Sequence, residues 1–388
     1  MNYELISVIF FLILLAIVIY RDRRNIEFKS GLIIRKSTRG RKFIYSFAAK
    51  HERTLKIIGN IGIIVSFLAS FYGLYLLFNS TYKIISKKST ESALKVVLPS
   101  VEGVKMPGFV LGVPFWYWII AVFVVMAAHE PMHALLARVE RVRIKSFGLL
   151  LFIVLPGAFV EPDELQLKKR STLGKLRIFA GGSFANLIIA ALFIFLVFLF
   201  GKLLSLILEP TGVSYEALIE GSYAEKVGLK GTIIKLNDRE IRTISDLSDF
   251  MQTIKPGEKI KVVTTENVYE IETIKDEESE RALIGIKNPY VEYRYKGFLS
   301  KYGHVSPSTL SLFQWIEGLF YWIFILNVGV GVFNLFPLKP LDGGLMFEAV
   351  CEHFFKKKSK RITTIVSVTL LILILFNIFG PSLLKLIS

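Results

Sequence analysis

Long stretches of apolar residues restrict the fold of this 388-residue chain more than any other feature of its sequence. The hydrocarbon core of a bilayer is about 30 Å thick, and a helix of about 20 apolar residues crosses it. The hydrophobic fraction of 53% and the mean hydropathy of +0.52 also exceed what is usual for a soluble domain. We therefore predict a polytopic α-helical membrane protein in contact with the lipid bilayer. The six predicted transmembrane helices cover residues 5–20, 57–78, 115–139, 178–208, 312–336 and 362–384.

The net charge of +16 raises the alternative of a nucleic-acid-binding protein. Its distribution argues against a nucleic-acid partner, because Lys and Arg gather beside the apolar stretches, as they do in the cytoplasmic loops of membrane proteins. Residues 1–56 are then predicted to hold a retained first transmembrane helix and a basic cytoplasmic loop. The same charge rule puts both ends of the chain on the extracytoplasmic side, in the cell membrane if the host is a prokaryote.

A shorter apolar stretch, residues 147–160, follows the third predicted helix and contains Pro156 and Gly157. Its 14 residues are too few to cross the hydrocarbon as a helix. Non-helical backbone is tolerated at membrane depth only where protein or water shields it from lipid. We therefore expect a re-entrant hairpin at this position.

Residues 211–288 are polar and differ in character from the stretches on either side. In residues 259–265 and 269–274, apolar and polar residues alternate as they do in strands. In residues 244–254, the apolar residues have helical spacing. Asn237-Asp238 and Pro256-Gly257 supply turns. The pattern predicts a small inserted α/β domain, which the charge rule puts on the extracytoplasmic side.

The third predicted helix contains His129-Glu130-Pro131-Met132-His133, a His-Glu-x-x-His pattern. Side chains four residues apart lie on one face of a helix, so both imidazoles can bind one metal ion, with Glu130 as general base for a zinc-activated water. The alternative is a pair of histidines that only pack between helices. Inside a bilayer that alternative is unfavourable, because ionisable side chains there are costly unless they are paired or functional.

A catalytic zinc needs a third protein ligand and one open position. Cys351 is the only cysteine in the sequence, so a thiolate cluster is excluded. The best candidate is Asp342, which follows an apolar stretch and two prolines and precedes Gly343 and Gly344. The alternative is a turn that ends a helix, where Asp-Gly is common. Two proline breaks at membrane depth expose backbone groups, which are tolerated there only in a cavity lined by protein or water. Such a cavity favours the interpretation of Asp342 as a ligand of a Zn²⁺ cofactor.

Together these residues resemble the site-2 protease family of intramembrane zinc metalloproteases. The family's zinc motif matches residues 129–133, and its Leu-Asp-Gly motif matches residues 341–343 within a longer Asn-x-x-Pro-x-x-Pro-Leu-Asp-Gly-Gly sequence that starts at Asn334. The segment 180–186 is similar to the family's Gly-x-x-x-Asn stretch, and residues 156–161 are similar to a membrane-inserted hairpin of eukaryotic-type members. Pro131 and Met132 stand at the variable positions of the zinc motif and leave the local helix geometry open.

The resemblance implies that His129, His133 and Asp342 hold Zn²⁺ and that Glu130 is the catalytic base. It also implies that Asn186 binds the substrate strand or the transition state, and it assigns Asn334 to substrate binding as well. The implied substrates are single-span membrane proteins, cut within their transmembrane segments.

Residues 221–231 and 233–238 look like part of a PDZ domain. In this family, such domains are implied to screen substrates outside the membrane after another protease has removed the substrate's ectodomain. The predicted organisation is therefore residues 1–56, a first part of the protease core at 57–208, the PDZ-like domain at 211–288, a second part of the core at 297–344, and a basic loop with the C-terminal helix at 345–388.

Two other classes of function compete with the protease. A membrane scaffold with a decayed metal site needs neither Glu130 nor Asp342, and both are present. A transporter can use His and Asp as a cation relay, but it is expected to show internal repeats, and the two halves of the sequence show none.

Overall fold

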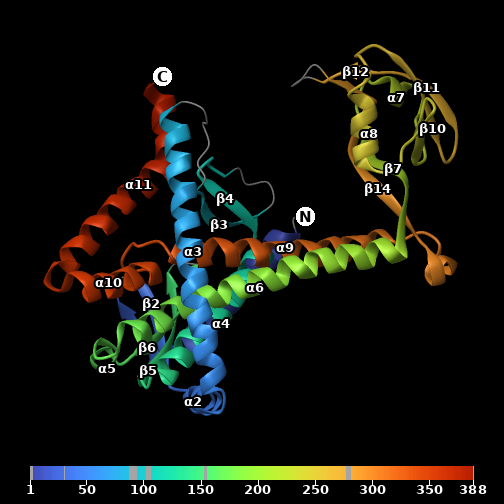
Figure 1. Ribbon diagram of the computed structural model, residues 1–388. Helices are drawn as coiled ribbons and strands as arrows, with labels where there is room; N and C mark the ends of the chain where they lie inside the picture. Colours follow the sequence, from blue (N-terminus) through green and yellow to red (C-terminus); the bar gives the residue numbers. More distant parts are fainter. Residues whose placement is uncertain are drawn as a thin grey trace. The chain divides into compact units, whose positions relative to one another are not determined.

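The structure, a computed structural model, describes residues 3–29, 31–86, 94–101, 106–152, 155–276 and 281–387 (Figure 1). Within these residues, six helical segments are long and apolar enough to cross a membrane, which confirms the predicted polytopic helical membrane protein. The helices that form them are α1 (Tyr3–Arg21), α3 (Glu52–Ile85), α4 (Phe115–Val139), α6 (Thr172–Ile207), α9 (Pro307–Asn334), and α10 (Asp342–Phe355) with α11 (Ser359–Ile387).

Several of these helices are longer than the apolar stretches that predicted them. The helix α6 begins at Thr172 and contains Lys175 and Arg177 before its apolar part. Lys and Arg are good helix formers, so a helix continues through them beyond the lipid-facing segment. Hydropathy marks only the apolar part of such a helix.

The predicted hairpin forms two antiparallel strands, β5 (Ile144–Phe152) and β6 (Leu155–Pro162). The structure adds two strands from the stretch predicted as a basic loop, β1 (Ile26–Lys29) and β2 (Leu32–Ser37). The four make one antiparallel sheet in the order β1-β2-β5-β6, and the helix α2 (Arg41–Lys50) follows β2. The sequence analysis did not predict β1 and β2. The two strands pair with each other, and β2 also pairs with a strand that lies far along the chain, as Ile33 with Leu151 does.

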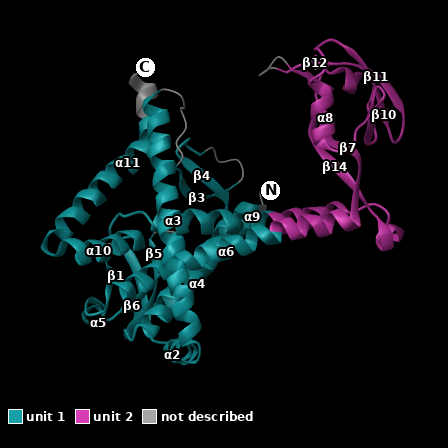
Figure 2. Cartoon of the chain, viewed as in Figure 1, with its two compact units in different colours: residues 1–196, 318–388 teal, residues 197–317 magenta. Residues whose placement is uncertain are grey.

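The chain divides into two compact units (Figure 2). The first comprises Met1–Leu196 and Gly318–Ser388, and the second is Val197–Glu317, so the division falls inside α6 and α9. Three short elements in the first unit complete it. They are the parallel strands β3 (Val96–Ser100) and β4 (Val110–Pro114) and the helix α5 (Glu164–Lys168).

The second unit is a small α/β domain, as the sequence pattern of residues 211–288 predicted. Its main sheet has the order β11-β10-β8-β7-β14, and β9 pairs with β8. The core contains Val213, Ile233, Val262 and Ile271. The elements are β7 (Leu208–Leu218), α7 (Tyr223–Lys226), β8 (Ile233–Leu236), β9 (Arg239–Glu240), α8 (Ile244–Met251), β10 (Lys259–Thr264), β11 (Val268–Glu272), β12 (Ile274–Lys275), β13 (Ala282–Leu283) and β14 (Ile286–Tyr295).

A reciprocal capping box fixes the start of α8. The Thr243 side chain accepts a hydrogen bond from the backbone of Asp246, and the Asp246 side chain accepts one from the backbone of Thr243. The hydrogen bond from the Thr243 hydroxyl, together with backbone N–H donors, holds the pKa of Asp246 below its usual range. The cap therefore defines where α8 begins, and Leu247 and Phe250 on its inner face pack into the domain core.

In the first unit, α3 supports a break between α9 and α10. The helix α9 ends at Asn334, and α10 begins at Asp342 after a turn with two prolines. Ser70 of α3 donates a hydrogen bond of 2.7 Å to the carbonyl oxygen of Leu335, a backbone group that the break exposes. The break is thus shielded by protein, which is the condition under which non-helical backbone is stable at membrane depth.

Candidate metal centre

The two histidines of the zinc motif lie on one face of α4, one turn apart. Their Nε2 atoms are 3.1 Å from each other, and their ring planes are inclined at 77°. Pro131 stands between them, yet α4 is continuous from Phe115 to Val139. The geometry question that Pro131 left open is therefore answered, because the helix keeps the spacing that puts both imidazoles on the same side.

Asp342 reaches the histidines because it is the first residue of α10. The turn of α10 that follows it packs directly on backbone, so that a Cβ at Gly343 would overlap the carbonyl group of Leu335 and one at Gly344 would overlap that of Leu338. Only glycine permits so close an approach between two backbones. The two glycines thus bring the start of α10, with its aspartate, against the end of α9. Asp342 therefore begins a helix and does not end one.

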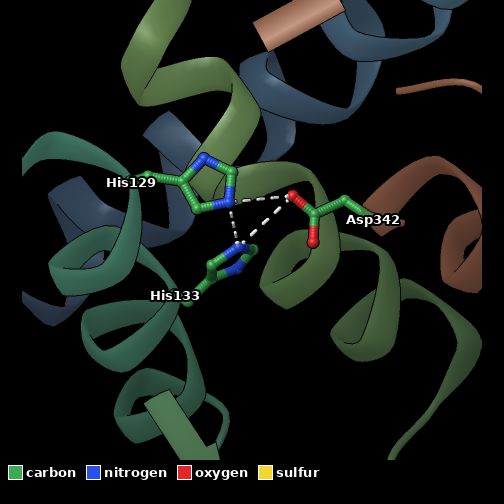
Figure 3. Close-up of side chains that lie close together, drawn as sticks. All are labelled: His129, His133 and Asp342. Atoms are coloured by element: carbon green, nitrogen blue, oxygen red, sulfur yellow. Dashed lines mark hydrogen bonds and ion pairs between the residues drawn. The ribbon is translucent and has the colours of Figure 1, made fainter. Parts of the chain in front are cut away.

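The three side chains converge on one point (Figure 3). The Oδ2 atom of Asp342 is 3.2 Å from His129 Nε2 and 3.3 Å from His133 Nε2. Ligand atoms at about 2.0–2.1 Å from a tetrahedral zinc ion are separated from one another by about 3.3 Å. The three separations, which are 3.1, 3.2 and 3.3 Å, agree with this geometry. His129, His133 and Asp342 can therefore hold one zinc ion.

The orientation of His133 supports this conclusion. Its Nδ1 atom lies 2.7 Å from the carbonyl oxygen of Ile178. A carbonyl oxygen only accepts, so Nδ1 carries the proton in the neutral ring and Nε2 keeps its lone pair. Nε2 is the atom that faces His129 and Asp342. A hydrogen bond from the second ring nitrogen to a backbone carbonyl is the usual way in which proteins orient a metal-binding histidine.

The other two candidate ligands are also in contact with α6. Ser183 donates a hydrogen bond of 3.1 Å to Oδ2 of Asp342, and the Asn186 amide nitrogen lies 3.0 Å from Nδ1 of His129. Both side chains are fully buried. The Oδ1 atom of Asn186 is buried without a hydrogen-bond partner. One face of α6 therefore contacts all three candidate ligands.

Glu130 lies on α4 between the two histidines and lines a hollow of about 240 Å³ between α4 and the four-stranded sheet. Of the remaining predicted site residues, Asn186 is brought to the centre. Asn334 is the last residue of α9, and within the described residues its side chain forms no hydrogen bond with His129, His133 or Asp342, so its role in substrate binding stays a prediction.

The sequence analysis singled out Gly182 and Ser183 only as members of the segment 180–186. The structure gives both a definite place beside the metal centre. A signal for this was present in the sequence, because Gly182, Ser183 and Asn186 fall on one face at helical spacing. The spacing alone does not say which helix that face contacts.

The lack of space beside Gly182 leads to a testable prediction. A Cβ at this position would overlap Nε2 of His133 and would lie 2.7 Å from the ring of His129. We expect Gly182→Ala to displace both imidazoles and to lower zinc affinity by about tenfold or more, as changes beside a metal site do. The measurement is a titration of the purified protein against a zinc chelator.

The neighbouring glycine provides a matched control for this experiment. The atoms nearest to a Cβ at Gly181 would belong to the side chains of Leu136 and Met132 and not to either histidine. We expect Gly181→Ala to keep zinc affinity within about twofold of the wild type, since the added methyl group does not touch the candidate ligands. Equal zinc affinities of the two variants would show that the space at Gly182 does not matter to the metal centre.

Comparison with known proteins gives an independent result. The family model described as "Peptidase family M50" matches residues 117–377. An uncharacterized protein of the archaeon Methanocaldococcus jannaschii is 27% identical over 93% of this chain and 88% of its own length. Two bacterial proteins carry the name "Putative zinc metalloprotease". The one from Clostridium acetobutylicum is 25% identical over 62% of this chain and 87% of its own length. The one from Fusobacterium nucleatum is 25% identical over 46% of this chain and 64% of its own length.

Proposed function

Because this chain belongs to peptidase family M50, as a membrane zinc metalloprotease, we propose that it cuts membrane-anchored proteins within their transmembrane segments. The observation that supports this location is the convergence of His129, His133 and Asp342 on helices that are apolar enough to cross a bilayer. Substrates of a site at lipid depth are single-span segments that reach it through the membrane. Ionisable groups in such helices are rare and mark functional sites.

His129, His133 and Asp342 are the proposed zinc ligands. When bound, zinc would supply a Lewis acid that polarises the scissile carbonyl and lowers the pKa of water to about 7. Glu130 is the proposed general base, which takes a proton from the attacking water and later passes it to the leaving amine. Glu130 stands between the two histidines in the sequence of α4, and it lines the hollow beside that helix.

The contacts of α6 suggest how the ligands are held. We propose that Asn186 turns its Oδ1 atom to accept the Nδ1–H of His129, which leaves the Nε2 lone pair of that ring for zinc. Rotation of an amide by 180° exchanges its oxygen and nitrogen, and the buried Oδ1 is without a partner in the present orientation. The amide nitrogen is then available to donate to a substrate carbonyl, which unites ligand orientation with the predicted substrate contact. Ser183 positions Asp342 by its hydrogen bond to Oδ2.

The test of the proposed function uses full-length purified protein in detergent. We expect about one zinc per chain, as for a site with three protein ligands, and cleavage of a single-span test substrate inside its apolar segment. Mass spectrometry of the two fragments locates the cut. Zinc binding without cleavage of any membrane substrate would contradict the proposal, as would cuts confined to the soluble part of the substrate.

The inserted domain is proposed to be PDZ-like, to lie on the extracytoplasmic side and to screen substrates after removal of their ectodomains. What supports a screening role is a groove of about 280 Å³ between α8 and residues 281–286. Leu247, Ser248 and Met251 of α8 line one side of it. A groove between a helix and a strand suits an extended peptide, whose main chain gives affinity and whose side chains give specificity.

A blocked groove provides the test of substrate screening. Ser248 is exposed and lines the groove, whereas Ser245 is exposed on the same helix and does not. We expect Ser248→Trp to slow cleavage of an ectodomain-trimmed substrate about tenfold, the effect of about 1.4 kcal/mol of lost binding. Ser245→Trp should cleave it as the wild type does. Equal cleavage of trimmed and intact substrate by the wild type would contradict screening, and so would equal rates for the two variants.

A further inference from the structure

An apolar cavity of about 410 Å³ lies on the side of α4 that faces α1 and the four-stranded sheet. Leu12, Leu15 and Ile19 contribute from α1, and Trp118 and Phe123 contribute from α4. Neither the predicted zinc ligands nor Asn186 lines this cavity. We refer to it below as the α1 cavity.

The α1 cavity adjoins the hollow at Glu130. That hollow shares Arg35, Phe123, Met126 and Leu149 with the α1 cavity. One unbroken series of side chains therefore leads from α1 to the proposed general base. An occupant of the α1 cavity would lie beside the place where a peptide bond must be presented to Glu130.

The lining of the α1 cavity selects for apolar occupants. Its charged members are Asp22 and Arg35, which form an ion pair with each other near the end of α1. All of its other lining residues are apolar or glycine. Burial of a charged group against such walls is unfavourable, whereas apolar side chains have no polar group to leave unpaired there. Transmembrane segments supply side chains of this kind.

Contacts along α1 hold it beside the cavity. Trp116 donates a hydrogen bond of 3.0 Å to the Ser7 hydroxyl, and Phe11, in the middle of α1, packs edge-on against Phe115. Just beyond the end of the helix, Asp22 pairs with Arg35. The helix α1 therefore forms a fixed wall of the cavity.

The size of the α1 cavity suits side chains. At about 410 Å³, it can receive a few apolar side chains of a substrate segment.

We propose that the α1 cavity binds apolar side chains of the substrate next to the scissile bond. Residues of α1 then help to determine which transmembrane sequences are cut. This inference rests on the proposed function and adds a substrate-binding site to it. The α1 residues lie outside residues 117–377, so this wall is not part of the segment that matches the family.

A filled cavity provides the test. Leu15 lines the α1 cavity, and its neighbour Leu14 is 50% exposed and does not line it. We expect Leu15→Trp to lower kcat/KM for a single-span substrate by about tenfold or more, the loss that is usual when a substrate fits an apolar pocket badly. The zinc content should stay at the wild-type value. The same substitution at the adjacent position, Leu14→Trp, should stay within about twofold of the wild type.

A second measurement does not depend on turnover. A photoreactive benzoyl-phenylalanine is placed at Leu15 or at Leu14 in the Glu130→Gln background, and the substrate is added before irradiation. We expect a covalent adduct with the substrate from position 15 and little from position 14. An adduct of position 15 with lipid alone would assign the cavity to acyl chains and would overturn the proposal.

The outcomes separate this inference from the function on which it rests. If the wild type cleaves the substrate and Leu15→Trp cleaves it equally well with no adduct at position 15, the inference fails and the protease stands. If the wild type cleaves no membrane substrate, the proposed function fails and the inference fails with it.

Discussion

Glu130→Gln is expected to bind zinc as the wild type does and to lose cleavage of membrane substrates. Glutamine has nearly the shape of glutamate but cannot take a proton from water at neutral pH. General acid–base groups contribute about 10²–10⁴-fold to rate, so we expect kcat to fall by at least about 100-fold. Zinc is retained because the three proposed ligands, His129, His133 and Asp342, remain in place. The measurements are metal content and the initial rate of cleavage of a single-span substrate.

The control for this variant is the same substitution at an exposed glutamate. The side chain of Glu164, on α5, is 77% exposed and forms only a surface ion pair with Lys168. Surface ion pairs contribute about 0–1 kcal/mol, so Glu164→Gln should cleave at the wild-type rate. Undiminished cleavage by Glu130→Gln would refute its role as the base and would require another residue to move the proton.

Asp342→Asn is expected to lower zinc affinity by more than about 100-fold, beyond the range that changes around a metal site usually produce. A neutral amide is a poorer ligand than a carboxylate, and the negative charge that faces two imidazoles is lost. The measurement is competition with a chelator of known affinity, followed by cleavage at saturating zinc. If zinc affinity is unchanged, the third ligand lies elsewhere.

A graded series strengthens this test. Ser183→Ala removes the hydrogen bond to Oδ2 of Asp342 but keeps the carboxylate, so it should weaken zinc binding by about 10–100-fold, less than Asp342→Asn. Asp249→Asn, on the exposed side of α8, should leave zinc affinity as it is. An effect of Ser183→Ala as large as that of Asp342→Asn would contradict the proposed roles, in which Asp342 binds the metal and Ser183 only positions it.

The sequence by itself determined several features that depend on local spacing. Apolar stretches identified the membrane-crossing helices because the thickness of the hydrocarbon fixes the length that they need. The four-residue separation of His129 and His133 already implied a shared face, since the pitch of a helix is constant. Asp342 was recognised because a carboxylate beside two proline breaks is unusual in an apolar segment.

Tertiary structure alone decided which distant residues meet. It brought Ser183 to Asp342 and Asn186 to His129, and it placed Gly182 where a methyl group would strike the imidazoles. It also joined residues 26–37 to the predicted hairpin and left a cavity between α1 and α4. These contacts come from the packing of one helix or strand on another. The spacing of residues along the chain specifies which face a residue occupies, but it does not specify what that face contacts.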